Sequence, residues 1–408
     1  MKILLVTRGS QGDIYPYLRL SQELLKRGHT VTINLPLAFE RHAKECGLKN
    51  ISIQGKDDIT GLMEEDLSTN DLLKWTYRVI DQQFKELPPL LKDHDVLVAS
   101  NTEFGAPTIA EYCQKPYLRT AYGPFIPGKK IPPPVFPWPH PNPVIRPSVL
   151  WGALNAGLNL MVKKTLNVHR ARLGLYPIKD QSEHAPTNAI NYLMYSPSLG
   201  STDPDWKYKW KIGGYIFNDN FSYDEDKYNK FMDFVNKDSK PLLFFTLGSC
   251  NSELRDQFAF LLDSVCKNLG CKLAVGSGWH EVGAKLQKHS DLFLLDGAVP
   301  HCKIFPHANA IIHHGGVGTV HNAARFGKPQ ILVPLFLDQW YWSYQLTNAG
   351  VSSGKIDIKK ITEKMLYKKV EDLLNNDCYK TNAEKLSALI QNEDGLTAMC
   401  SEIEKMLS

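Results

Sequence analysis

A buried strand, a glycine turn, a helix and a second strand follow one another within the first 35 residues, and this order constrains the fold most strongly. Lys2–Thr7 is a short apolar run, and the polar turn Arg8–Asp13 contains two glycines. Apolar residues then recur at helical spacing until Gly28, and His29–Leu35 is typical of the next strand. A strand–helix–strand unit of this length requires a parallel sheet with a right-handed crossover.

Further strand-like runs extend this pattern and repeat it in the second half of the chain. They are Asp95–Ser100, Lys115–Arg119, Leu242–Leu247, Cys271–Val275, Leu292–Leu295, Ala310–His313 and Gln330–Val333. The sequence therefore predicts an α/β protein of two Rossmann-like, doubly wound domains facing each other across a cleft. We predict an N-terminal domain at 1–215, a linker at 216–240, a C-terminal domain at 241–390 and a final helix at 391–408, for which packing back on the first domain is one arrangement.

Composition and charge exclude several other classes. Hydrophobic residues make up 43% and charged residues 22%, which is typical of a globular chain rather than a disordered one. The net charge of +4 is small for a dedicated nucleic-acid-binding protein. The apolar start is too short for a signal peptide, no run is long enough to span a membrane, and the eight cysteines are scattered. We expect a cytoplasmic protein for which peripheral membrane contact stays open.

A proline-rich segment interrupts the first domain. Ten of the 25 prolines lie in Pro124–Pro147, together with Phe125, Phe136 and Trp138, so a helix or central strand is excluded there. Two interpretations remain: an irregular packed excursion, or a lid or wall over an apolar ligand. The apolar helix expected at Ser148–Met161 belongs to the core or to a membrane-proximal surface, and we favour the core.

The pattern that points most directly to a ligand is His313–Thr319, where a strand enters a glycine turn that opens a helix. Amides at a helix N-terminus and the helix dipole favour an anion, and glycines let the backbone approach a phosphate. His314 and Thr319 add further donors. Asp338 and Gln339 follow the next strand, on the same sheet edge, where they could pair with sugar hydroxyls. The alternative for Asp338 is an N-cap.

Together these motifs resemble the GT-B nucleotide-sugar glycosyltransferases of family 1. His313–Thr319 followed by Asp338-Gln339 is similar to their donor motif. Gly9–Pro16 is similar to a segment of sterol glucosyltransferases and of glycopeptide-antibiotic and macrolide glycosyltransferases. Val299-Pro300-His301 also fits, and the resemblance extends from residue 1 to about 350.

The resemblance implies roles for individual residues. The donor-binding set that it implies is Gly248, Ser249, Trp279, Val299, His314, Gly316, Gly318, Thr319, Asp338 and Gln339. Val299 would contact the nucleobase, and Trp279 would line the nucleotide pocket. The diphosphate would be held by the glycines together with Ser249, His314 and Thr319. The acceptor-binding set is Gln11, Phe104, Phe125, Phe136 and Trp138. Further aromatic candidates, which could equally belong to the core, are Trp75, Tyr77, Phe84, Trp151 and Trp342.

Asp13 matches the catalytic base of the sterol and glycopeptide branches. A carboxylate can take the proton of an attacking hydroxyl, and burial in a cleft would raise its pKa toward neutrality. The alternative is a helix N-cap. This chain has Gln11 where the sterol branch usually has arginine, and Ala298 and His301 where plant relatives have Trp and Gln, so the nucleotide and sugar stay open.

These inferences predict an inverting, metal-independent hexosyltransferase without a cofactor. UDP-glucose is the expected donor, a dTDP-sugar is the alternative, and the acceptor is an apolar small molecule such as a sterol, a lipid or a natural-product aglycone. Asp203-Pro204-Asp205 has the spacing of a metal motif but lies close to the expected linker. The other functions considered are a nucleotide-sugar epimerase of the same fold and a non-catalytic binding partner.

Overall fold

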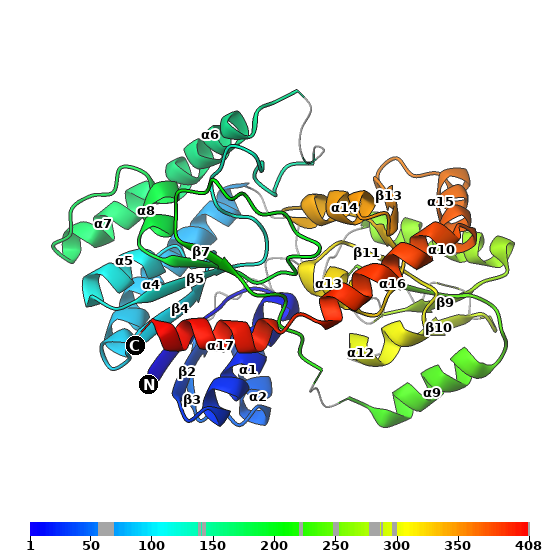
Figure 1. Ribbon diagram of the computed structural model, residues 1–408, viewed down its shortest axis with the longest axis horizontal. Helices are drawn as coiled ribbons and strands as arrows, with labels where there is room; N and C mark the ends of the chain where they lie inside the picture. The colour runs from blue at the N-terminus through cyan, green and yellow to red at the C-terminus, as the bar shows by residue number, and fades with distance from the viewer. Residues whose placement is uncertain are drawn as a thin grey trace. The chain divides into compact units, whose positions relative to one another are not determined.

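The computed structural model describes residues 1–55, 69–137, 140, 144–219, 223–247, 253–276, 286, 289–295 and 300–406 (Figure 1). They form two compact units. The first consists of Met1–Pro133, His140–Phe217 and Glu393–Ser408, and the second of Pro134–Pro139 and Asn218–Asn392. Each unit has a parallel sheet with helices packed around it.

The first unit contains a seven-stranded sheet with the order β3-β2-β1-β4-β5-β6-β7. Its strands are β1 (Lys2–Val6), β2 (Thr30–Leu35), β3 (Asn50–Ile53), β4 (Val96–Ser100), β5 (Tyr117–Ala121), β6 (Ile190–Leu193) and β7 (Trp210–Ile212). Its helices include α1 (Gln11–Lys26), α2 (Glu40–Glu45), α4 (Thr69–Lys92), α5 (Ala106–Cys113), α6 (Pro147–Leu158), α7 (Lys164–Arg172) and α8 (Gln181–Thr187).

The second unit contains a six-stranded sheet with the order β10-β9-β8-β11-β12-β13. Its strands are β8 (Leu242–Thr246), β9 (Lys272–Val275), β10 (Leu292–Leu294), β11 (Ala310–His313), β12 (Gln330–Leu332) and β13 (Ser352–Lys355). Its helices include α9 (Glu225–Asn236), α10 (Glu253–Leu269), α12 (His301–Ile304), α13 (Val317–Arg325), α14 (Gln339–Asn348), α15 (Glu363–Asn375) and α16 (Asp377–Gln391).

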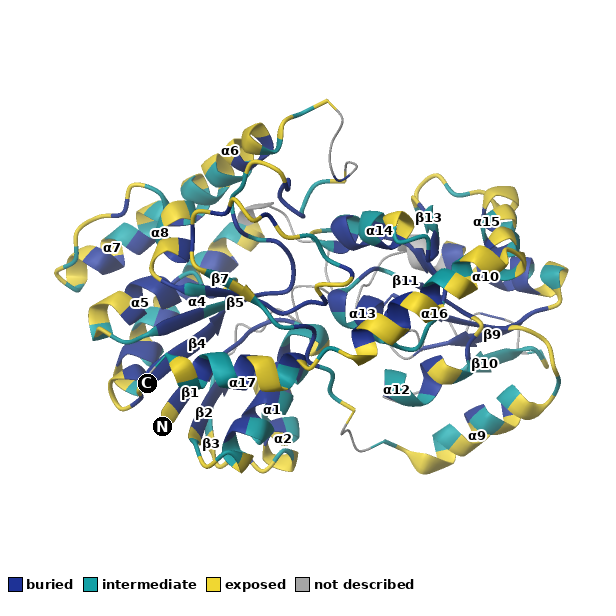
Figure 2. Cartoon of the chain, in the orientation of Figure 1, coloured by how far each residue is buried: buried dark blue, intermediate teal, exposed yellow. Residues whose placement is uncertain are grey.

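In both sheets the chain order reverses at one point, beside the first strand. This switch point lies between β1 and β4 in the first sheet and between β8 and β11 in the second. Open parallel sheets bind ligands at the carboxyl ends of the strands beside such a point. The central strands β1, β4, β8 and β11 are almost entirely buried, so their side chains form the core and leave ligand contacts to the following loops (Figure 2).

The apolar runs identified in the sequence are confirmed as strands. Ala310–His313 is reproduced residue for residue, and the others differ by one or two residues at an end. The strands β3, β6, β7 and β13 have no counterpart among the predicted ones. The final helix α17 (Gly395–Lys405) belongs to the first unit, where it packs on α1.

The helix expected at Ser148–Met161 is present, but its assignment to the core is wrong for one face. α6 is followed by a π-helical turn, Asn159–Lys163, which leads into α7. Leu150 and Trp151 are buried, whereas Val149 is 60% and Leu160 86% exposed. Apolar composition alone did not reveal that only half of this helix has a partner.

The described part of the proline-rich segment contains neither helix nor strand up to Arg146, as predicted, and its last residue, Pro147, begins α6. Much of it is packed. Ile126 and Ile131 are buried, and the Ile131 carbonyl accepts a hydrogen bond from Trp151 Nε1 at 2.8 Å. In the second unit, the Pro137 carbonyl accepts hydrogen bonds from Tyr344 Oη and Lys355 Nζ, each at 3.1 Å. These contacts agree with the packed excursion, and the lid or wall over an apolar ligand stays a prediction.

Candidate functional site

The first glycine turn follows the carboxyl end of β1 and leads into α1. Gly9 has a φ of +131°, and a Cβ added there would lie 2.3 Å from Asp13 Oδ2, so only glycine fits. Ser10 is the N-cap of α1 and Asp13 its third residue. Asp13 Oδ2 accepts hydrogen bonds from the Ser10 backbone nitrogen at 2.9 Å and from Ser10 Oγ at 3.2 Å. The N-cap position that was the alternative for Asp13 is therefore occupied by Ser10.

The Asp13 carboxyl group is a weaker acid than an exposed aspartate. Burial raises its pKa to about 6, although the hydrogen bonds from Ser10 lower it. Its backbone carbonyl is fixed as well, because it accepts hydrogen bonds from Tyr122 Oη at 3.0 Å and from Thr7 Oγ1 at 3.3 Å. A carboxyl group with a pKa near neutrality, in a fixed position at the switch point, is suited to proton transfer.

A second buried acid lies behind this turn and was not singled out in the sequence. Glu103 follows β4, and its Oε1 lies 3.6 Å from Arg8 Nε. Gln83 Nε2 donates a hydrogen bond to Glu103, and Gln83 Oε1 accepts one from the Gly105 backbone at 2.7 Å. Burial raises the pKa of Glu103. The only signal in the sequence was its place just after a strand that borders the switch point.

The structure describes four of the five predicted acceptor residues, three in the first unit and one in the second. Gln11 is exposed as the first residue of α1. Phe104 packs against a hydrophobic cluster formed by α4 and α7, and the Phe125 carbonyl accepts a hydrogen bond from Arg119 Nη1. Phe136 belongs to the second unit, and Trp138 lies outside the described residues. Three further aromatic candidates are core residues with at most 8% exposure: Trp75, Trp151 and Trp342.

The second glycine turn follows the carboxyl end of β11 and leads into α13. Gly315 has a φ of +95°, and a Cβ there would lie 2.9 Å from Leu332 Cδ2 and 3.2 Å from the Gln339 carbonyl oxygen. Gly316 is the N-cap of α13, without a side chain to bond the first amides. Backbone amides of a first helical turn have no partner within the helix. They are therefore available to an anion, as the sequence predicted.

Two adjacent histidines at this turn have different surroundings. His313 is buried, with Nε2 2.8 Å from Gln330 Oε1 and Nδ1 accepting a hydrogen bond from the Gly315 amide at 3.1 Å. It is thus a neutral, structural ring. His314 Nδ1, in contrast, has no hydrogen-bond partner among the described residues. Burial, with a contribution from His301, lowers the pKa of His314 to about 4, so this ring is neutral as well.

The loop before α14 meets the second turn, since Gly315 packs on the backbone of Gln339. Asp338 Oδ2 accepts a hydrogen bond from Trp342 Nε1 at 2.9 Å, which fixes the carboxylate. Asp338 is also the N-cap of α14, although its side chain does not cap the helix. Gln339 Oε1 accepts hydrogen bonds from the backbone amides of Leu335 (2.7 Å) and Phe336 (3.2 Å). Leu337, which lies between Phe336 and Asp338, has a φ of +51°, a strained value for leucine.

Four donor-site predictions lie outside the described residues: Gly248, Ser249, Trp279 and Val299. Gly318 and Thr319 are the second and third residues of α13. The Asp203–Asp205 pair is engaged within the first unit. Asp203 Oδ2 accepts a hydrogen bond from the Lys130 amide at 3.1 Å, and Asp205 Oδ2 lies 2.7 Å from Lys130 Nζ.

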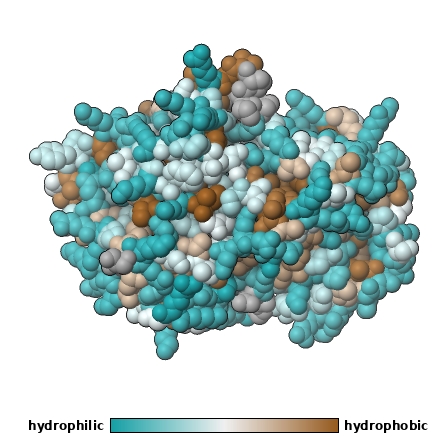
Figure 3. Space-filling model, in the orientation of Figure 1, coloured by the Kyte–Doolittle hydropathy of each residue, from teal (hydrophilic) through white to brown (hydrophobic). Residues whose placement is uncertain are grey.

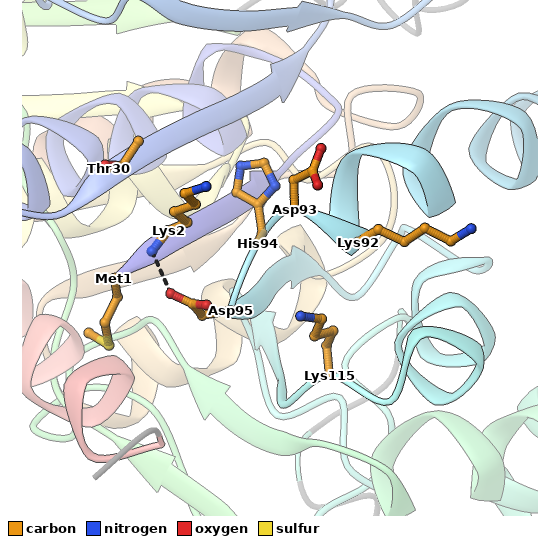
Figure 4. A pocket seen from close by; sticks show the side chains of 8 residues that line it. All are labelled: Met1, Lys2, Thr30, Lys92, Asp93, His94, Asp95 and Lys115. Atoms are coloured by element: carbon orange, nitrogen blue, oxygen red, sulfur yellow. Dashed lines mark hydrogen bonds between the residues drawn. The ribbon is translucent and has the colours of Figure 1, made fainter.

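A cavity of about 480 Å³ lies at the opposite, amino ends of the strands in the first unit (Figure 4). Its lining residues are Met1, Lys2, Thr30, Lys92, Asp93, His94, Asp95 and Lys115. The Lys2 backbone nitrogen donates a hydrogen bond to Asp95 Oδ2 at 2.8 Å there. Because Asp13 follows the carboxyl end of β1, this cavity is separate from the predicted site.

Two family models match the beginning and the end of the chain. Residues 3–130 match the glycosyltransferase family 28 N-terminal domain, and residues 285–406 match the erythromycin biosynthesis protein CIII-like C-terminal domain. The chain has the GT-B glycosyltransferase fold. The resemblance inferred from the two turns is confirmed.

Sterol 3-beta-glucosyltransferases are similar to this GT-B glycosyltransferase along almost its whole length. The protein of Debaryomyces hansenii is 26% identical over 96% of this chain, and that of Komagataella phaffii is 26% identical over 97%. The chain spans only 26% and 34% of these two relatives. A sterol 3-beta-glucosyltransferase of Arabidopsis thaliana is 22% identical over 100% of the chain and 68% of that protein.

Solved structures confirm the predicted GT-B fold of two doubly wound domains. The spinosyn forosaminyltransferase SpnP has a TM-score of 0.73 at 15% identity, covering 100% of this chain and 99% of that one. The glycosyltransferase VinC in complex with dTDP has a TM-score of 0.72 at 17% identity, with the same coverage of both chains.

Proposed function

We propose that this chain transfers a hexosyl group, most simply glucose from UDP-glucose, to a hydroxyl of an apolar small molecule. The second unit would bind the nucleotide sugar and the first the acceptor. The sterol 3-beta-glucosyltransferases matched along the chain support a sterol or similar lipid as the acceptor, and the antibiotic-type structural neighbours support a natural-product aglycone.

Asp13 carries this proposal, because its pKa of about 6 lies close to physiological pH. The deprotonated carboxylate would accept the proton of the acceptor hydroxyl as its oxygen attacks the anomeric carbon. The bond from that carbon to the diphosphate oxygen breaks in the same step, and UDP leaves. One base and one displacement invert the anomeric configuration. The fixed position of Asp13 beside Ser10 supports this role.

The second glycine turn would stabilise the leaving diphosphate without a metal. The first amides of α13 present partial positive charge, and His314 Nδ1 has no partner among the described residues. Since His314 is neutral, it would donate one hydrogen bond rather than a full charge. The remaining predicted phosphate contacts, Gly248 and Ser249, and the nucleotide contacts Trp279 and Val299, belong to this proposal.

Asp338 and Gln339 would both bind the sugar hydroxyls, and Asp338 would contribute more hydrogen bonds than Gln339. Trp342 orients the Asp338 carboxylate by a hydrogen bond to Oδ2, and a carboxylate can accept several hydrogen bonds at once. Gln339 spends its side-chain oxygen on two backbone amides, so only its amide nitrogen remains for the sugar. We therefore assign the larger part of hydroxyl recognition to Asp338.

The test begins with thermal-shift measurements using UDP, dTDP, GDP and ADP, each with EDTA and with Mg²⁺. A ligand that binds only the folded state raises its stability. We expect UDP or dTDP to raise the Tm equally under both conditions, whereas a shift that requires Mg²⁺ would overturn the metal-independent mechanism. UDP release is then measured with and without sterols. Release that needs an acceptor supports the transferase, rapid turnover of donor alone supports an epimerase, and binding without turnover supports a non-catalytic partner.

A further inference from the structure

α6 and the π-helical turn that follows it expose an uncharged, apolar face. Val149 is 60% and Leu160 86% exposed, and Ala153 and Ala156 between them are exposed as well. Residues at these spacings lie on one side of a helix. No residue from Pro147 to Met161 carries a charge. A soluble helix normally places charged side chains on its outward face, so this face is unusual.

The opposite face fixes which side of α6 points outward. Leu150 and Trp151 are buried, and Trp151 Nε1 bonds the Ile131 carbonyl at 2.8 Å. Val144, just before the helix, is 88% exposed. Figure 3 shows hydrophobic atoms projecting at the top of the view, where Figure 1 draws the chain that leads into α6. The exposed face is therefore a fixed feature of the first unit.

The chain segment that contains this face has charges of one sign, although Asp180 Oδ1, from just beyond it, accepts a hydrogen bond from Asn159 Nδ2 at 2.8 Å. The 68 residues from Tyr112 to Lys179 contain ten lysines and arginines and no aspartate or glutamate. The whole chain has 43 acidic residues in 408, so a stretch of 68 residues with the average composition would contain about seven acidic residues. Arg146 precedes α6, and Lys163 and Lys164 follow it, so cations flank the apolar face at both ends.

We propose that the face of Val149, Ala153, Ala156 and Leu160 docks on the surface of an anionic phospholipid bilayer. An apolar helix face with flanking cations lies in the plane of a lipid interface, with the apolar side chains among the acyl chains and the cations at the headgroups. No helix in the described part of the chain could cross a bilayer, so the contact is with its surface. A second copy fits less well, since it would bring cations against cations. The inference does not depend on the proposed transfer reaction.

The first test is co-sedimentation of the full chain with vesicles of phosphatidylcholine alone and with 30% phosphatidylserine. We expect binding to the anionic vesicles that weakens as salt is added. Leu160→Glu should lower the partition coefficient about tenfold or more, because it removes a leucine from the interface and adds a like charge. Leu389→Glu on α16, also at an exposed leucine (56%), is the matched control and should bind like the wild type.

The second test separates charge from hydrophobic contact. Replacing Lys163 and Lys164 by glutamine should weaken binding to anionic vesicles by about fivefold per lysine and leave the weak binding to neutral vesicles unchanged. Lys359 and Lys360, an exposed lysine pair in the second unit, are replaced in the same way as the control. Equal melting temperatures establish that each variant is folded. Absence of vesicle binding, binding unaffected by Leu160→Glu, or a dimer that Leu160→Glu dissociates would each overturn the proposal.

Discussion

The two units use the same turn for opposite electrostatic purposes. In each, a strand beside the switch point is followed by a turn that contains a glycine with positive φ, Gly9 or Gly315, and then by an N-cap and a helix. The third helical residue is Asp13 in α1 and Thr319 in α13. The first turn therefore holds its own carboxylate on the Ser10 amide, whereas the second has no acidic side chain in that place.

This difference shows how one residue changes what a helix N-terminus offers. Where the third residue is an aspartate, the turn contains a fixed carboxylate and is suited to accept a proton. Where it is a threonine, the first amides and the neighbouring His314 Nδ1 are available for the negative charge of a ligand. The comparison predicts that variants in the first turn affect the chemical step, and that variants in the second affect donor binding.

The largest effect is expected from Asp13→Asn. Asparagine keeps an oxygen for the Ser10 amide but cannot accept the acceptor proton, so kcat should fall by about 10²–10⁴-fold. UDP affinity, measured by calorimetry, should stay within about twofold, because the donor site is unchanged. Loss of UDP binding in this variant would contradict the division of roles between the two turns.

Gly9→Ala should come next. The added Cβ would lie 2.3 Å from Asp13 Oδ2 and displace the carboxylate, so we expect a loss of kcat of about 10²-fold at unchanged UDP affinity. Gly28→Ala is the control, because Gly28 also has a positive φ (+83°) but no atom within 4 Å of the added Cβ. If both variants lose the same activity, backbone strain rather than the carboxylate is responsible.

Gly316→Ala tests the second turn. Its Cβ would lie 2.4 Å from His314 Nε2 and push the ring aside, so the Kd for UDP should rise about tenfold or more. Gly327→Ala, just beyond the other end of α13, adds a Cβ with no contact shorter than 3.5 Å; its φ of +64° strains the alanine, but the variant should bind UDP normally. A fall in kcat at unchanged Kd would place the second turn in proton transfer instead.

The pH dependence should also differ between the turns. Because the pKa of Asp13 is raised to about 6, activity should fall about tenfold per pH unit below that value and level off above it. His314, with a pKa of about 4, stays neutral over the same range, so UDP-glucose affinity should be flat from pH 5.5 to 8. A rate profile without a step near pH 6 would exclude Asp13 as the base.

The smallest effect concerns stability. A carboxyl group whose pKa is raised on folding lowers the stability of the folded state progressively as the pH rises from its ordinary pKa of 3.8 to the raised value of about 6, and by the full amount above that. Asp13→Asn should therefore be at least as stable as the wild type at pH 8, and should lose this advantage near pH 4. Urea unfolding at both pH values measures the difference. A variant that is less stable at pH 8 would mean that the charged hydrogen bond to Ser10 outweighs the cost of burial.

The helices and strands that could be predicted from the sequence are those whose side chains are equally buried along the whole element. Ala310–His313 is apolar on both faces and bounded by polar residues, so its ends were evident. β7 and β13 are edge strands of three and four residues with mostly half-exposed side chains, and such segments do not differ in composition from loops.

The candidate site was predicted where a backbone conformation demands a particular residue. Gly9 and Gly315 could be identified because their turns require glycine. In the second unit, Gly315 of the donor turn packs against Gln339, the residue that follows Asp338. The Arg8–Glu103–Gln83 network could not be predicted, because Arg8 and Glu103 lie about 95 positions apart in the sequence and only the fold brings them together. For α6 the sequence left a core helix and a membrane-proximal surface open and favoured the core, because exposure depends on which elements pack against the helix.

The course of the chain between the units has a consequence for its synthesis. The first unit includes Glu393–Ser408, where Glu393 Oε1 accepts a hydrogen bond from Ser196 Oγ at 2.7 Å and Arg27 lies 3.4 Å from Glu404. The chain leaves the first unit at Phe217 and returns to it at Glu393. The ribosome therefore makes the second unit before the segment that completes the first, so the first unit gains α17 only after the second has been synthesised.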